Sequence, residues 1–196
     1  VGIAFLFAQR LHPAMKNVAS VRKELGVETI FNILGPLTNP ATATHQMIGV
    51  YDRDLLKPVV EVLKNLGSQR AMAVHGTDGL DEVTTTAATF VSEFNGREIV
   101  SYSIHPQDFK IAVSSPEALK GGDLQKNVQI AQGILQGQKG PQRDVVVLNA
   151  GCGLYIAQKA KNIGEGIRLA EESIDSGRAL EKLEALKDFT GWQSGK

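Results

Sequence analysis

Two acidic side chains stand side by side directly after a glycine-rich turn. Asp81 and Glu82 follow the sequence GTDGL at 76–80. Carboxylate oxygens are the ligands that a hard cation such as Mg²⁺ prefers, and Mg²⁺ usually keeps several waters and shares other positions with substrate phosphates. The pair therefore predicts a magnesium site. A solvated acidic turn is the alternative that two adjacent acids leave open.

A basic side chain borders the apolar face of a helix predicted over residues 13–25. The apolar stripe, at helical spacing, consists of Ala14, Val18, Val21 and Leu25. Pro13 suits the first helical position, which makes His12 the expected N-cap, and Gly26 fits the left-handed residue after the helix. Arg22 lies next to the stripe, where a guanidinium can hold a carboxylate by two parallel hydrogen bonds. An Arg22 that reaches out to water is the other interpretation.

The apolar run after this helix is predicted to break at a Gly-Pro pair. It reads IFNILGPL at 30–37, and Gly35 and Pro36 interrupt it. A glycine lets the backbone approach a ligand closely. With Arg22 and His12 nearby, this segment would wall a pocket for a flat, anionic, partly apolar molecule.

Buried strands and helices alternate through the rest of the chain. Strands are expected at 45–51, 70–75, 90–94 and 99–104. Helices are expected at 3–11, 53–66, 116–119, 123–136, 142–160, 163–176 and 178–188. Pro58 predicts either a kink or a start near Lys57 for the second of these helices. The pattern indicates an α/β fold with a mixed, mostly parallel sheet flanked by helices.

The order of these elements also predicts where a ligand binds. Asn95 and Gly96 between the last two strands are a hairpin signal, so an antiparallel pair is expected there. Ligands of open α/β sheets gather at the carboxyl ends of strands. The turn at 76–82 follows the strand at 70–75 and belongs to that edge.

The overall composition excludes several classes of protein. The chain has 196 residues with 21 basic and 21 acidic side chains, so its formal net charge is zero. That balance argues against a protein held by nucleic-acid phosphates or anionic lipid. No apolar run approaches the roughly 18 residues of a membrane helix. The single cysteine, Cys152, allows no internal disulfide, favours a cytoplasmic setting and is expected to pack in the core.

Several blocks of the sequence resemble anthranilate phosphoribosyltransferase, an enzyme family of tryptophan biosynthesis. They are FLFAQRLHPAMKNVASVRKELG at 5–26, TIFNILGPLTNP at 29–40, VHGTDGLDEVT at 74–84 and, more weakly, LNAGCGLY at 148–155. The family's N-terminal helical domain and its glycine-rich phosphoribosyl pyrophosphate loop have no counterpart here. Residues 1–196 are therefore expected to be the C-terminal part of an incomplete catalytic α/β domain of nucleoside phosphorylase/phosphoribosyltransferase type.

The resemblance implies a reaction and an acceptor site. The family transfers the 5-phosphoribosyl group from phosphoribosyl pyrophosphate to the amine of anthranilate and releases pyrophosphate. By this resemblance Arg22 would bind the anthranilate carboxylate, and His12 would line the same channel. Gly35 and Pro36 would pack against the aromatic ring.

The resemblance also implies a metal and an assembly. Asp81 and Glu82 would carry Mg²⁺ on the pyrophosphate, and no residue is expected to act as acid, base or nucleophile. The full-length protein would be a cytoplasmic homodimer that binds small molecules but neither nucleic acid nor membrane. Because the phosphate loop has no counterpart, this stretch alone is expected to be inactive.

Two other functions stay open from the sequence. A pyrimidine nucleoside phosphorylase would share the fold but would need a nucleobase site, and the HPAMKNVASVR block at 12–22 favours anthranilate instead. A non-catalytic, nucleic-acid-binding relative would be markedly basic and would lack Arg22 or the acidic pair. This chain is neutral and has both.

Overall fold

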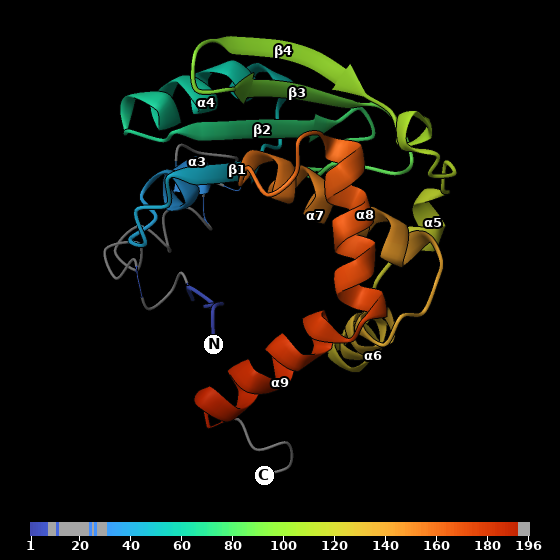
Figure 1. The fold of residues 1–196 in the computed structure, drawn as a ribbon. Helices are drawn as coiled ribbons and strands as arrows, with labels where there is room; N and C mark the ends of the chain where they lie inside the picture. Colours follow the sequence, from blue (N-terminus) through green and yellow to red (C-terminus); the bar gives the residue numbers. More distant parts are fainter. Residues whose placement is uncertain (8–10, 12–23, 25, 27–30, 192–196) are drawn as a thin grey trace.

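The computed structural model describes residues 1–7, 11, 24, 26 and 31–191, and its centre is a four-stranded sheet (Figure 1). The strands lie in the order β1 (His45–Gly49), β2 (Arg70–Gly76), β3 (Thr89–Phe94) and β4 (Ile99–Ile104). β1 and β2 are parallel, whereas β2 with β3 and β3 with β4 are antiparallel. The mixed α/β fold is confirmed. Fewer pairings are parallel than predicted in this part of the chain, because the loop 77–88 returns beside β2 without a crossover helix.

Helices occupy most of the remaining described chain. They are α3 (Phe31–Leu37), α4 (Leu56–Asn65), α5 (Pro116–Leu119), α6 (Leu124–Leu135), α7 (Pro141–Ile156), α8 (Ile163–Asp175) and α9 (Arg178–Phe189), with short 3-10 helices η2 (Arg53–Leu55) and η3 (Pro106–Phe109). Each helix expected after residue 110 is present within a few residues of its predicted limits. No helix in these ranges has both the length and the apolar character needed to cross a membrane.

Both faces of the sheet are buried by helices. On β2, Met72 and Val74 pack in the cluster that α7 and α8 complete, whereas Ala71 and Ala73 pack in the cluster under α4. Figure 1 shows α4 on one side of the sheet and α7 and α8 on the other. All four side chains are fully buried, which explains why β2 reads as continuously apolar rather than alternating.

The start of α4 follows from its sequence. Asp52 accepts a hydrogen bond from the Asp54 N–H at 2.9 Å and caps the 3-10 turn η2. Pro58 lies in the first turn of α4, where its missing N–H costs no helical hydrogen bond. The prediction of a start near Lys57 is therefore confirmed.

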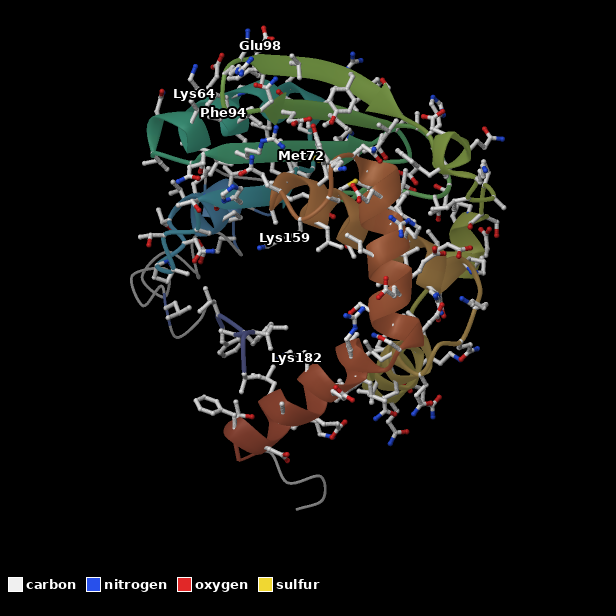
Figure 2. The ribbon with its side chains drawn as sticks, in the orientation of Figure 1. Lys64, Met72, Phe94, Glu98, Lys159 and Lys182 are labelled. Carbon is white, nitrogen blue, oxygen red and sulfur yellow. The ribbon has the colours of Figure 1, made fainter. Side chains whose placement is uncertain are left out.

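A cation–π contact lies at the end of the sheet opposite the turn at 76–82. Lys64 of α4 lies 5.2 Å from the centroid of the Phe94 ring, and Figure 2 shows both side chains there, together with Glu98.

The N-terminal segment lies beside α9, where Lys182 donates a hydrogen bond to the Val1 carbonyl at 2.9 Å.

Two local predictions in the first 40 residues differ from the structure. Of the helix expected at 3–11, residues 3–7 form neither helix nor strand, Leu11 is helical, and residues 8–10 lie outside the described residues. Gly35 and Pro36 lie inside α3 rather than in a loop. Ile33 and Leu37 of α3 pack against the cluster under α4, and this burial of one helical face outweighs the helix-breaking tendency of Pro36.

Candidate functional site

The loop 77–88 is pressed against the carboxyl end of β1. A Cβ added to Gly49 would lie 1.5 Å from the carbonyl oxygen of Asp81, so only glycine allows this approach. The loop also closes on β2 through the Gly76 N–H, which donates to the Leu80 carbonyl at 2.7 Å. The turn therefore lies where the parallel strands β1 and β2 both end, as the sequence predicted.

The first acid of the turn is part of the loop's internal structure. Asp78 accepts hydrogen bonds from the hydroxyls of Thr84, at 2.6 Å, and Thr86, and from the Leu80 N–H at 3.2 Å. Burial raises the pKa of Asp78, but the hydrogen bonds from Thr84 and Thr86 outweigh it and hold the pKa below its usual value. Asp78 is thus a charged internal anchor of the turn.

A side chain from α7 fixes the other end of the acidic pair. The side-chain oxygen of Asn149 accepts from the Val83 N–H at 3.0 Å, and its amide donates to the Val83 carbonyl at 2.7 Å. Val83 itself is fully buried. Asn149 therefore satisfies both backbone groups of the residue that follows Glu82.

Asp81 and Glu82 are exposed between these anchors. None of the ion pairs among the described residues involves either carboxylate, and neither accepts a side-chain hydrogen bond there. The described ranges also contain no cluster of three or more His, Cys, Asp or Glu suited to a metal. Two exposed carboxylates fit Mg²⁺, because this ion is usually bound by one or two carboxylates plus waters and substrate phosphates.

The predicted acceptor residues are only partly placed. His12 and Arg22 lie outside the described residues. Gly35 is half-buried and Pro36 is exposed, both on α3. No hydrogen bond within the described chain joins α3 to the loop 77–88. The binding of a substrate carboxylate by Arg22 and the packing of Gly35 and Pro36 against an aromatic ring therefore stay predictions.

The other chemically capable side chains have structural roles. Nδ1 of His75 lies 2.8 Å from the Val50 carbonyl oxygen, which requires it to donate, and His105 forms a capping box with Asp108. Cys152 is fully buried, and burial, reinforced by the charge of Glu93, raises its thiol pKa to about 12. Such a thiol stays protonated at neutral pH. The prediction that Cys152 packs in the core is confirmed.

Sequence reasoning missed the residues that hold the acidic loop. The sequence analysis assigned no role in the site to Asn149, Gly49 or Asp78. A signal existed for Asn149, because it is the one amide in the apolar run VVVLNAG at 145–151. A buried amide must find partners, so a long-range hydrogen bond was to be expected there.

Comparison with known proteins adds evidence independent of this geometry. A family model described as "Glycosyl transferase family, a/b domain" matches residues 1–180. The anthranilate phosphoribosyltransferase of Acetivibrio thermocellus is 51% identical over 190 residues, covering 97% of this chain and 55% of that protein. The chain spans about half the length of the curated relatives it matches.

Solved structures agree with the sequence matches. The crystal structure of anthranilate phosphoribosyltransferase from Thermus thermophilus gives a TM-score of 0.83 at 43% identity, over 90% of this chain and 53% of that one. The Saccharomyces cerevisiae enzyme in complex with phosphoribosyl pyrophosphate and Mg gives 0.79 at 30% identity, over 88% and 50%. Another structure of the yeast enzyme contains 4-fluoroanthranilate. With the family model matched over residues 1–180, this chain belongs to the glycosyl transferase family, α/β domain.

Proposed function

We propose that this chain is part of an anthranilate phosphoribosyltransferase, a cytoplasmic glycosyltransferase of tryptophan biosynthesis. One observation carries the proposal: Asp81 and Glu82 are exposed on a turn fixed at the carboxyl ends of β1 and β2. The relatives support it, since proteins about half identical over nearly the whole chain bear this name. The yeast relative also binds Mg and phosphoribosyl pyrophosphate in its crystal structure.

In the proposed reaction, one bond at the anomeric carbon of the ribose replaces another. The bond to pyrophosphate breaks, and its electron pair leaves with the pyrophosphate. The amine nitrogen of anthranilate forms the new bond and then loses a proton. Positioning both substrates can lower the barrier by about 7–11 kcal/mol without a protein nucleophile.

The residues divide this work between two ends of the site. Asp81 and Glu82 would hold Mg²⁺, which when bound supplies positive charge for the departing pyrophosphate. Arg22 would hold the anthranilate carboxylate, and His12 would line the channel. The wall formed by Gly35 and Pro36 would come from α3.

The first prediction tests the metal-carrying role in the full-length protein. Asp81→Asn with Glu82→Gln should abolish the Mg²⁺ dependence and most of the anthranilate-dependent pyrophosphate release, because amides cannot supply the two anionic ligands. A matched control is the exposed adjacent pair on α8, Glu171→Gln with Glu172→Gln, which should leave the rate unchanged.

Two outcomes would contradict the proposal. One is an unchanged metal response in the Asp81/Glu82 variant. The other is phosphorolysis of thymidine or uridine in place of anthranilate-dependent pyrophosphate release.

Light scattering on the full-length protein would test the homodimer. Titration with DNA at low salt should show no binding, since the chain's formal net charge is zero.

A further inference from the structure

Asn149 connects α7 to the acidic loop across 66 positions of sequence. Its oxygen accepts from the Val83 N–H, and one amide hydrogen goes to the Val83 carbonyl at 2.7 Å. The second amide hydrogen goes to the Val145 carbonyl of α7 at 2.9 Å. The side chain thus uses both donors and its acceptor, which no other residue of this size and shape can do.

The position of this clamp matters for the neighbouring acids. Val83 directly follows Glu82, and the Asp81 carbonyl is pressed against Gly49. The backbone of the two acidic residues is therefore held at two points, by β1 at the peptide between them and by α7 at the residue after them. The backbone that carries the carboxylates is fixed by these contacts, while the carboxylates themselves point to solvent.

Two neighbouring carboxylates repel each other when no cation is present. Coulomb repulsion favours any backbone change that separates them, and the described residues offer no basic partner to offset it. A fixed backbone prevents that relaxation, so the pair is already arranged when the metal arrives. Groups that orient metal ligands in this way typically change metal affinity or activity by about 10–100-fold when removed.

We infer that Asn149 is a positioning residue for the Asp81–Glu82 pair, and that its clamp on Val83 strengthens metal-dependent binding of phosphoribosyl pyrophosphate. This inference rests on the proposed function. A positioning role differs from a purely structural one in what it predicts. A residue that only stabilised the fold would change the binding of phosphoribosyl pyrophosphate and of anthranilate alike.

The test measures binding rather than turnover in the full-length protein. The dissociation constant for phosphoribosyl pyrophosphate is determined by calorimetry with saturating Mg²⁺ and again with EDTA. The constant in EDTA divided by the constant in Mg²⁺, called the Mg²⁺ ratio below, gives the factor by which the metal strengthens binding. Asn149→Ala should reduce this ratio by about 10-fold. In steady state, the KM for phosphoribosyl pyrophosphate should rise while the KM for anthranilate stays unchanged.

The chain offers a closely matched control. Asn127 holds Gly122 in the same two-sided way, accepting from its N–H at 2.9 Å and donating to its carbonyl at 3.1 Å. Asn127→Ala removes an equivalent clamp at the start of α6, outside the acidic loop. It should leave the Mg²⁺ ratio at the wild-type value. An equal loss in both variants overturns the inference.

Hydrogen exchange tests the clamp without any substitution. In metal-free wild-type protein the Val83 amide should exchange far more slowly than an unprotected amide, because Asn149 and burial shield it. Exchange at the unprotected rate overturns the inference even if Asn149→Ala does not fold.

Failure of the inference and failure of the proposed function give different results. If Mg²⁺ strengthens binding of phosphoribosyl pyrophosphate to the wild type and to Asn149→Ala by the same factor, only the role of Asn149 is overturned. If Mg²⁺ does not strengthen binding to the wild type, so that its Mg²⁺ ratio is near one, and Asp81→Asn with Glu82→Gln changes nothing, the metal role of the acidic pair is overturned as well.

Discussion

Asp78 and Asp81 share one loop and are both exposed, but they differ in their hydrogen bonds. The Asp78 carboxylate accepts hydrogen bonds from the hydroxyls of Thr84 and Thr86, whereas that of Asp81 has no ion-pair partner within the described chain. Thr84 is itself almost fully buried, and its hydroxyl donates to Asp78 while it accepts a hydrogen bond from the Thr86 N–H at 3.0 Å. One acid therefore builds the turn, and the other is available for a ligand.

This division predicts contrasting stabilities for two otherwise similar variants. Asp78→Ala should lower the free energy of unfolding by about 1–3 kcal/mol, because it removes the acceptor that the Thr84 and Thr86 hydroxyls and the Leu80 N–H share. Asp81→Ala should change it by no more than about 0.5 kcal/mol, as is usual for exposed positions. Urea unfolding at neutral pH measures both values. Equal losses in the two variants would show that the anchor role is misassigned.

At the scale of the elements, α7 and α8 pack with their backbones in close contact. A Cβ on Gly166 would lie 2.2 Å from the Gly151 carbonyl oxygen, and one on Gly151 would lie 2.6 Å from Cγ1 of Ile167. The two helix backbones thus touch at a pair of glycines. This contact holds the helix that carries Asn149, and it explains the glycine at position 151.

Substitutions at these glycines should differ in sign. Gly166→Ala should destabilise the protein by about 1–3 kcal/mol, because the added methyl forces the backbones apart. Gly153→Ala on α7 meets open space and should be neutral or stabilise by up to about 1 kcal/mol, since alanine favours helix. Thermal unfolding compares the pair. A destabilised Gly153→Ala together with an unaffected Gly166→Ala would rule out this packing.

At the scale of the whole molecule, one ion pair joins the start of α7 to the end of α8. Arg143 is 2% exposed and donates to Asp175 at 2.5 Å, and Lys139 donates to the other carboxylate oxygen at 3.0 Å. The hydrogen bonds from Arg143 and then Lys139 lower the pKa of Asp175 to about 2. Protonating Asp175 would leave the buried guanidinium without its counter-charge.

The lowered pKa predicts how global stability depends on pH. A carboxyl whose folded pKa is depressed contributes stability above its unfolded value, near 3.8, and this contribution is lost as the pH falls toward about 2. Asp175→Asn should therefore flatten the decline of the urea midpoint between those pH values. The exposed pair of Arg178 with Glu172 is the control, and Glu172→Gln should retain the wild-type decline. A wild-type decline in Asp175→Asn would contradict the assignment.

The sequence by itself determined most of the secondary structure and the location of the acidic turn. Strands such as β2, the hairpin at Asn95 and the helices from α5 onward depend on local periodicity and turn residues, which a sequence displays directly. The Gly35-Pro36 segment was predicted as a loop because proline is a strong local signal. Burial of Ile33 and Leu37 reversed that preference, and burial is a property of the tertiary structure.

Only the tertiary structure decided which polar groups support the turn. The clamp of Asn149 on Val83 and the approach of Gly49 to Asp81 join residues from separate elements. Such contacts depend on how the helices pack against the sheet, and neither spacing nor composition encodes them locally. A carboxylate becomes an anchor or an available ligand according to the hydroxyls and amides that folding brings beside it, as Asp78 and Asp81 show.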